Sequence, residues 1–79
     1  MGRRLPRASW KECDRAFKRD GWYEVVRQSG DHHHYAHPRK LGLVTIPERV
    51  TLAMPLLKSI LKQAGLSNEQ FVKLLKGRD

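Results

Sequence analysis

Four histidines within six positions are the feature of this chain that is best suited to chemistry. They are His32, His33, His34 and His37, and they follow a Ser-Gly-Asp turn and precede Pro38. Imidazole is the side chain whose ordinary pKa lets it accept or release a proton near neutral pH. The cluster therefore indicates general acid–base chemistry.

The net charge indicates the kind of substrate that such a site would meet. Lys and Arg total 16 against 8 Asp and Glu, which gives a formal net charge of +8. A field of this size attracts RNA, DNA, an anionic membrane or an acidic protein. The first eleven residues carry four of these cations and no acid, a pattern typical of a solvated tail. No apolar run approaches the length of a membrane span.

Length and cysteine content limit how the chain is organised. A chain of 79 residues allows one domain, and its single Cys excludes an internal disulfide bond. A lone Cys without the apolar stretch of a signal peptide is typical of the cytoplasm, where we expect this protein. We expect a basic tail over residues 1–8, a single domain over 9–76 and a short tail over 77–79.

Helix and strand signals alternate along the chain in a simple order. Ser9 and Glu12 have the spacing of a capping box at a helix start, and Ser67 and Gln70 repeat that spacing. Aromatic and β-branched runs separated by turn residues indicate strands, and Pro47 ends the last of them. The expected elements are a helix over about 10–20, strands over 22–28, 32–37 and 43–46, a helix over 54–64, and a short helix after Ser67.

This order predicts an α+β fold with a three-stranded antiparallel sheet that helices cover on one face only. Side chains on a strand alternate between the two faces, so at most two or three of the histidines share a site. Periodicity alone does not tell which set faces outward. One set is His32, His34 and Ala36, and the other is His33, Tyr35 and His37.

The chain contains, in order, Asp20-Gly21-Trp22, residues 26–30, His32-His33, Tyr35, His37-Pro38, residues 44–47, residues 57–67 and Phe71. Taken together, these segments resemble the HicA toxins over about residues 9–75. The resemblance implies a double-stranded-RNA-binding-domain-like fold, α-β-β-β-α, and metal-independent cleavage of messenger RNA without a cofactor. It also implies a HicB antitoxin as partner.

The resemblance implies that His32 is the catalytic residue, since it matches the histidine of the family's Gly-Ser-His turn. Asp31 replaces the Ser of that turn, and Arg49 stands where the family often has His. The pair Pro55-Leu56 replaces a Gly-Thr before the second helix. Because neighbours on a strand point to opposite faces, we expect no direct hydrogen bond between Asp31 and His32 unless the turn bends the two residues together. We expect Asp31 to repel an approaching phosphate.

RNA supplies its own nucleophile, the ribose 2′-hydroxyl, which attacks the adjacent phosphate once a base removes its proton. Histidine suits that task and also the protonation of the departing 5′-oxygen. Lys and Arg hold the phosphate, and an aromatic ring stacks on a base. The candidates nearest in sequence are Arg27, Arg39, Lys40, Arg49 and Tyr35. Alternatives to RNA binding remain open for these residues. Arg39 and Lys40 could lie in a solvated loop. Arg27 could lie on the outer face of a strand, and Tyr35 could pack in the core.

Three other functions compete with this interpretation. His32 and His34 could offer two metal ligands, although a structural site normally needs four, and we expect no metal. The fold could grip double-stranded RNA without cutting it, although Lys73 and Lys76 do not form a dense lysine run. We see no helix-turn-helix signature for DNA. We expect mRNA and a HicB-like antitoxin as partners, no membrane, a monomer when free and a hetero-oligomer with the antitoxin.

Overall fold

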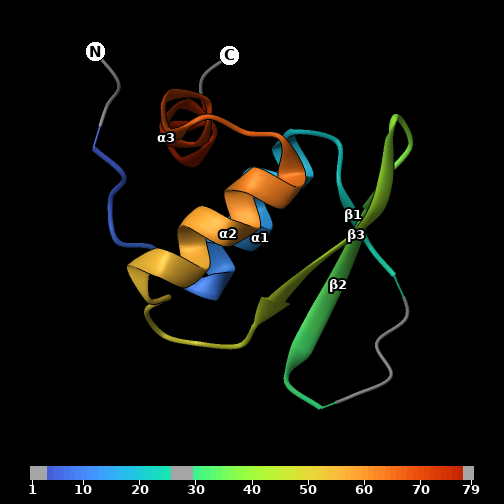
Figure 1. Ribbon diagram of the computed structural model, residues 1–79, viewed down its shortest axis with the longest axis horizontal. Helices are drawn as coiled ribbons and strands as arrows, with labels where there is room; N and C mark the ends of the chain where they lie inside the picture. Colours follow the sequence, from blue (N-terminus) through green and yellow to red (C-terminus); the bar gives the residue numbers. More distant parts are fainter. Residues whose placement is uncertain (1–3, 26–29, 78–79) are drawn as a thin grey trace.

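The structure, a computed structural model, describes residues 4–25 and 30–77 and contains a sheet with helices on one side (Figure 1). The three strands are antiparallel in the order β1-β2-β3. This confirms the predicted α+β fold, a dsRBD-like α-β-β-β-α arrangement with an extra C-terminal helix. The elements are α1 (Trp10–Arg19), β1 (Tyr23–Glu24), β2 (His32–His37), β3 (Lys40–Pro47), α2 (Met54–Ala64) and α3 (Asn68–Lys76).

Both predicted capping boxes form, and they set where α1 and α3 begin. The Ser9 hydroxyl accepts the backbone N–H of Glu12 at 3.2 Å, and the Glu12 carboxylate accepts the Ser9 N–H at 2.9 Å. Ser67 and Gln70 make the same reciprocal pair at 3.1 and 2.8 Å. Because each box satisfies two otherwise unpaired N–H groups, the start of each helix is fixed locally.

The third strand is longer than predicted. It begins at Lys40, which pairs with His37 directly across a tight turn, whereas the sequence indicated a loop up to Gly42. A register shift between Tyr35 and His37 absorbs the extra residues of β3. Among described residues the first strand is restricted to Tyr23–Glu24, and residues 26–28 of its predicted range, 22–28, lie outside them.

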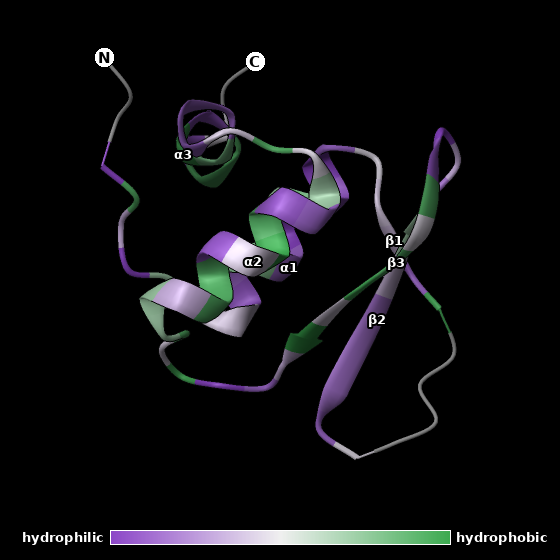
Figure 2. Cartoon of the chain, in the orientation of Figure 1, coloured by the Kyte–Doolittle hydropathy of each residue, from purple (hydrophilic) through white to green (hydrophobic). Residues whose placement is uncertain are grey.

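The core lies between the sheet and the helices. α1 and α2 both contact β3, and α3 packs on α1. Figure 2 shows most of β2 as hydrophilic, whereas the end of β3 is hydrophobic. β3 and the helices therefore supply most of the apolar core. Its largest fully buried side chains include Tyr35, Phe17, Phe71, Ile46, Leu52, Leu57, Ile60 and Leu61.

The segment before α1 is packed against this core. Ala8 is 2% exposed, and its carbonyl accepts the backbone N–H of Leu52 at 2.9 Å. Leu5 is partly buried against the core as well. Packed structure therefore starts before residue 9, where the sequence placed the edge of the domain. The apolar residues within the basic segment are what hold it there.

Candidate functional site

His32 is the first residue of β2 and stands at one end of the sheet, opposite Pro47 of β3. Its side chain is 48% exposed, and Nδ1 lies 3.1 Å from Oδ1 of Asp31. Within the described part of the chain, Nε2 has no hydrogen-bond partner. The ring therefore lies beside a carboxylate at one nitrogen and is about half exposed.

The turn before β2 brings the Asp31 carboxylate within ion-pair distance of His32. Asp31 belongs to the turn before β2, so the alternation of side chains along a strand does not apply to it. Its backbone carbonyl accepts the N–H of Glu48 at 2.7 Å, which ties the turn to the end of β3. A carboxylate beside Nδ1 favours the tautomer with a proton there, and Nε2 then carries the basic lone pair.

His33, the next residue, has the opposite environment. It is 5% exposed, and its ring stacks on that of Trp10 with centroids 4.2 Å apart and an interplanar angle of 14°. Nδ1 lies 2.5 Å from Oε2 of Glu24, and Nε2 lies 3.0 Å from Oε1 of Glu48. Both nitrogens must donate to bond two carboxylates, so this geometry selects the doubly protonated imidazolium.

The His33 cluster (His33, Trp10, Glu24 and Glu48) joins four parts of the chain at the residue next to His32. Trp10 comes from α1, Glu24 from β1, His33 from β2, and Glu48 follows β3. The buried imidazolium of His33, with a carboxylate at each ring nitrogen, holds these parts of the chain in one arrangement. This role was not predicted, since neither glutamate has a local signal that pairs it with a distant histidine.

The remaining two histidines have structural contacts. His34 Nδ1 lies 2.9 Å from the Thr45 hydroxyl, a cross-strand pair on the open face of the sheet. His37 Nε2 donates to the carbonyl of Asp20 at 2.8 Å, and its Nδ1 accepts the backbone N–H of Arg39 at 3.0 Å. The neutral form of His37 therefore uses both ring nitrogens in hydrogen bonds.

Arg49 is the predicted phosphate-binding residue that the structure places at the same end of the sheet as His32. It lies two positions after Pro47, the partner of His32, and is exposed. Its carbonyl accepts the backbone N–H of Trp10 at 3.0 Å, which anchors this loop to α1. Arg27, another candidate, lies outside the described residues.

Tyr35 is not available to stack on an RNA base, which corrects its assignment as an RNA-binding residue. It is 0% exposed, and its hydroxyl donates to Oδ1 of Asp14 at 2.6 Å. Burial, and then this hydrogen bond, raise the pKa of the Tyr35 phenol far above its ordinary value. The side chain therefore belongs to the core, as its position on the same strand face as His33 requires.

Arg39 and Lys40 do not gather around His32 as the sequence suggested. They follow β2 at the other end of the β2–β3 hairpin, five steps of roughly 3.3 Å or about 17 Å away. Lys40 Nζ donates to the carbonyl of Ala64 at 2.5 Å and lies 3.7 Å from Oδ2 of Asp20. Lys40 therefore binds the C-terminal end of α2, where a cation is favourable.

Two further observations bear on the competing functions. In the described part of the chain, no three His, Cys, Asp or Glu side chains are placed to hold a metal ion together. No described helix has the length and apolar character needed to cross a membrane.

Comparison with known protein families identifies the family of this chain. A family model described as HicA toxin of bacterial toxin-antitoxin matches residues 10–66, which is most of the chain. No curated protein sequence matches the chain. The family match includes α1, the sheet and α2, together with the exposed His32. The chain therefore belongs to the HicA toxin family, the toxins of bacterial toxin–antitoxin pairs.

Proposed function

We propose that this protein is a metal-independent endoribonuclease that cuts mRNA, with His32 as its catalytic acid–base residue. We propose further that a HicB-like antitoxin neutralises it. The observation that carries the proposal is the contrast among the four histidines. His33 and His37 use both ring nitrogens, and His34 is partly buried with Nδ1 against the Thr45 hydroxyl, whereas the His32 side chain is 48% exposed and its Nε2 has no partner among the described residues.

The reaction follows from one basic nitrogen beside an RNA phosphodiester. Nε2 of His32 takes the proton from a ribose 2′-hydroxyl, and the oxygen forms a bond to the adjacent phosphorus. The bond from phosphorus to the 5′-oxygen then breaks, and the imidazolium returns the proton to that oxygen. The products are a 2′,3′-cyclic phosphate and a 5′-hydroxyl. The step uses no metal, since RNA supplies the nucleophile.

Charge around His32 acts on both the substrate and the ring. Arg49 is the described cation best placed to offset the negative charge that builds on phosphate in the transition state. The Asp31 carboxylate orients His32 through Nδ1 but also repels phosphate. Because Asp31 and His32 are both well exposed, solvent screens their attraction, and orientation is its main effect.

The decisive experiment compares the wild-type protein with His32→Ala on a long single-stranded RNA, with and without EDTA. General acid–base catalysis is worth about 10²–10⁴-fold, so we expect His32→Ala to lose at least about a hundredfold in cleavage rate. Cleavage by the wild type should survive EDTA. Mapping the cut ends should give cyclic phosphates, because the 2′-oxygen is the nucleophile.

His34→Ala is the matched control, since His34 lies on the same strand and face two residues further on. It should cut RNA at nearly the wild-type rate, and melting curves should show that both variants fold. Undiminished cleavage by His32→Ala would refute the assignment, and loss of cleavage in EDTA would indicate a metal. Binding of double-stranded RNA without cleavage would indicate a binding module instead.

A further inference from the structure

The face of the sheet that lies away from α1 and α2 is its open face (Figure 1). Residues along a strand alternate between the two faces, and cross-strand partners share a face. His32 and Ala36 therefore share the open face with Tyr23 of β1, the partner of Ala36. Glu24, the residue after Tyr23, contacts buried His33 on the covered face, as this alternation requires.

Tyr23 presents an aromatic ring to solvent on the open face. It is 53% exposed, and among the described residues its hydroxyl has no hydrogen-bond partner. Its cross-strand neighbour Ala36 is small, and Leu43 of β3, which precedes buried Val44, is 56% exposed. A half-exposed ring beside small and apolar side chains is a surface on which another planar ring can stack.

Charge on the open face suits a polyanion. Within the described strands the one acidic residue is Glu24, and it contacts His33 on the covered face. No carboxylate of these strands therefore repels phosphate along the open face. Asp31 lies in the turn at the His32 end, where Arg49 is also exposed. The formal net charge of +8 attracts RNA to the molecule as a whole.

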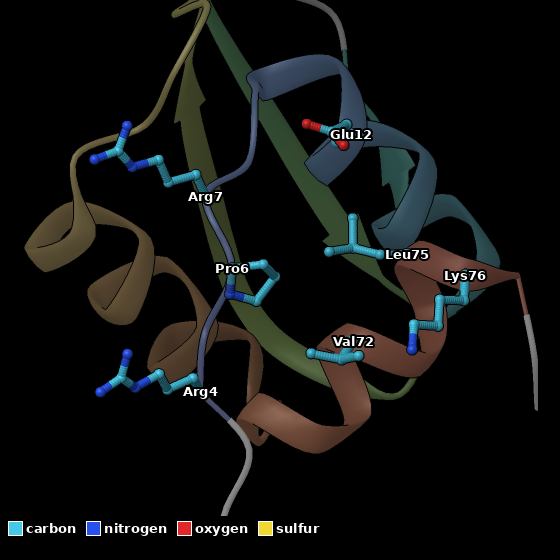
Figure 3. Close-up of a pocket in the computed structure, with 7 residues that line it drawn as sticks. All are labelled: Arg4, Pro6, Arg7, Glu12, Val72, Leu75 and Lys76. Carbon is cyan, nitrogen blue, oxygen red and sulfur yellow. The ribbon is translucent and has the colours of Figure 1, made fainter.

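The groove drawn in Figure 3 does not serve His32. It has a volume of about 530 Å³, and none of the described strand residues lines it. The guanidinium groups of Arg4 and Arg7 point away from Val72 and Leu75, over α2. RNA that reaches His32 is therefore not held in this groove, and residues of the sheet have to hold it.

The spacing of Tyr23 and His32 sets the form of RNA that can touch both. Ala36 lies four residues after His32, so steps of roughly 3.3 Å place Tyr23 about 13 Å along the face. A single nucleotide does not span this distance, whereas a short strand does. Bases of a duplex are stacked inside it and do not reach a protein ring. The arrangement therefore favours a single strand whose stacked base lies away from the cleaved bond.

We propose that Tyr23 stacks on an unpaired base of the RNA substrate and so holds the strand along the open face. The proposal rests on the RNA cleavage proposed above and adds a substrate-binding residue to it. Tyr23 takes the role that the sequence suggested for Tyr35, which the core buries. Because every base has a flat face, such a contact selects unpaired RNA without selecting a particular base.

The first measurement is binding of a fluorescein-labelled single strand of 2′-O-methyl RNA in EDTA, followed by fluorescence anisotropy. This probe has no free 2′-hydroxyl, so the result does not depend on whether His32 is catalytic. Stacking on one base strengthens binding by about tenfold or more, so Tyr23→Ala should bind about tenfold more weakly than the wild type. Tyr23→Phe keeps the ring and should bind like the wild type.

Two variants separate stacking from other effects. Tyr23→Leu keeps apolar bulk without a ring and should bind as weakly as Tyr23→Ala. Leu56→Ala removes an exposed apolar side chain from α2, away from the open face, and should bind like the wild type. Melting curves should show that all variants fold. Equal affinities of Tyr23→Ala and Tyr23→Phe would overturn the proposal, as would wild-type affinity of Tyr23→Leu.

Two further probes test whether the ring contacts a base. A duplex of the same sequence, and a strand of equal length that has ribose and phosphate but no bases, should each bind the wild type and Tyr23→Ala equally. The reason is that neither probe offers an unpaired base to the ring. A tenfold loss on either probe would overturn the proposal, because Tyr23 would then contact the backbone.

Cleavage of an unmodified single strand separates Tyr23 from His32. Tyr23→Ala should raise KM about tenfold and leave kcat nearly unchanged, because the stacked base is bound equally before and during the reaction. His32→Ala should lower kcat instead. An unchanged KM in Tyr23→Ala would overturn the role of Tyr23. Undiminished cleavage by His32→Ala would refute the catalytic assignment alone, since binding of the 2′-O-methyl strand does not depend on it.

Discussion

At the scale of single residues, His32 and His33 show how one step along a strand changes the role of a side chain. The two rings point to opposite faces of the sheet. One is half exposed beside a solvated carboxylate, and the other is buried between two carboxylates and an indole. The first suits proton transfer with substrate, whereas the second suits holding the site in place.

Replacing Asp31 by Ser introduces the residue that the resemblance to the HicA toxins implies at this turn. We expect RNA cleavage equal to or greater than that of the wild type, because the carboxylate that repels phosphate is gone. The lost contact to His32 costs little, since both groups are exposed. Cleavage rates at low and high salt check this, and the difference from the wild type should shrink in high salt. A large loss of activity would show that Asp31 has a more direct role.

Removing the buried cation at position 33 should weaken the fold. His33→Phe keeps a ring against Trp10 but removes the imidazolium that bridges Glu24 and Glu48. Because hydrogen bonds to charged groups contribute about 1.5–3 kcal/mol, we expect a loss of about 2 kcal/mol in the free energy of unfolding. Urea unfolding measures it.

Glu24→Gln added to His33→Phe provides the control. It removes one of the two opposed carboxylates, so the double variant should recover part of the lost stability. His34→Phe, on the solvent face of β2, should cost much less than His33→Phe. Equal costs at the two positions would show that the His33 cluster contributes nothing particular.

At the scale of elements, the turn between α1 and β1 shows how a contact with a residue far along the chain restricts which amino acid the turn can contain. Gly21 has a φ of +99°, a conformation that other residues rarely adopt. A Cβ built on it would lie 2.9 Å from Nε2 of His37, which in turn donates to the Asp20 carbonyl. The turn and the end of β2 are therefore packed without room for a side chain.

Gly21→Ala should be more destabilising than the same change at Gly42. Gly42 also has a positive φ, +82°, but a Cβ added there would meet nothing within 4 Å. Both variants incur the conformational cost of about 1–2 kcal/mol, and Gly21→Ala also displaces His37. Thermal unfolding of the two variants measures the difference. Equal melting temperatures would show that His37 moves aside freely.

At the scale of the whole molecule, the core contains two acidic groups that stay protonated only while it is intact. Burial, and then the neighbouring Glu12, raise the pKa of the Cys13 thiol to about 12. Burial and the hydrogen bond to Asp14 raise the pKa of Tyr35 as well. In the unfolded chain both groups lose protons at a lower pH, so alkali favours unfolding.

Stability should therefore fall as the pH rises above about 9, the ordinary pKa of the thiol. The native state then binds more protons than the unfolded state, which makes the slope of unfolding free energy against pH negative. Between about pH 8 and about pH 10 we expect Cys13 to account for a loss of about 1–2 kcal/mol. Urea unfolding at the two pH values measures it, and Cys13→Ala should show a smaller drop. A wild-type stability that does not change would contradict the expectation.

Local signals predicted much of the fold. The two capping boxes formed as predicted, since a Ser and a residue three positions later satisfy each other without distant partners. The bounds of β2 also agree with prediction. The start of β3 was wrong, because the register shift in the hairpin depends on how Tyr35 and Val44 enter the core.

The candidate site was predictable only in part. Proximity in sequence suggested that Arg39 and Lys40 serve His32, but an extended strand carries them about 17 Å away. Tyr35 was assigned to RNA because a strand residue has no local mark of the face it occupies. The Glu24–His33–Glu48 contacts join residues 9 and 15 positions from His33, and such pairs have no short-range signal.

The sequence by itself determined the order of elements, the alternation of the histidines and the basic charge, since these depend on neighbours a few residues apart. Tertiary structure decided which face of β2 is covered, and with it which histidine is exposed. The reason is that α1 can bury its apolar stripe only against the face that carries Tyr35 and His33. His32 is left on the other face, open to solvent.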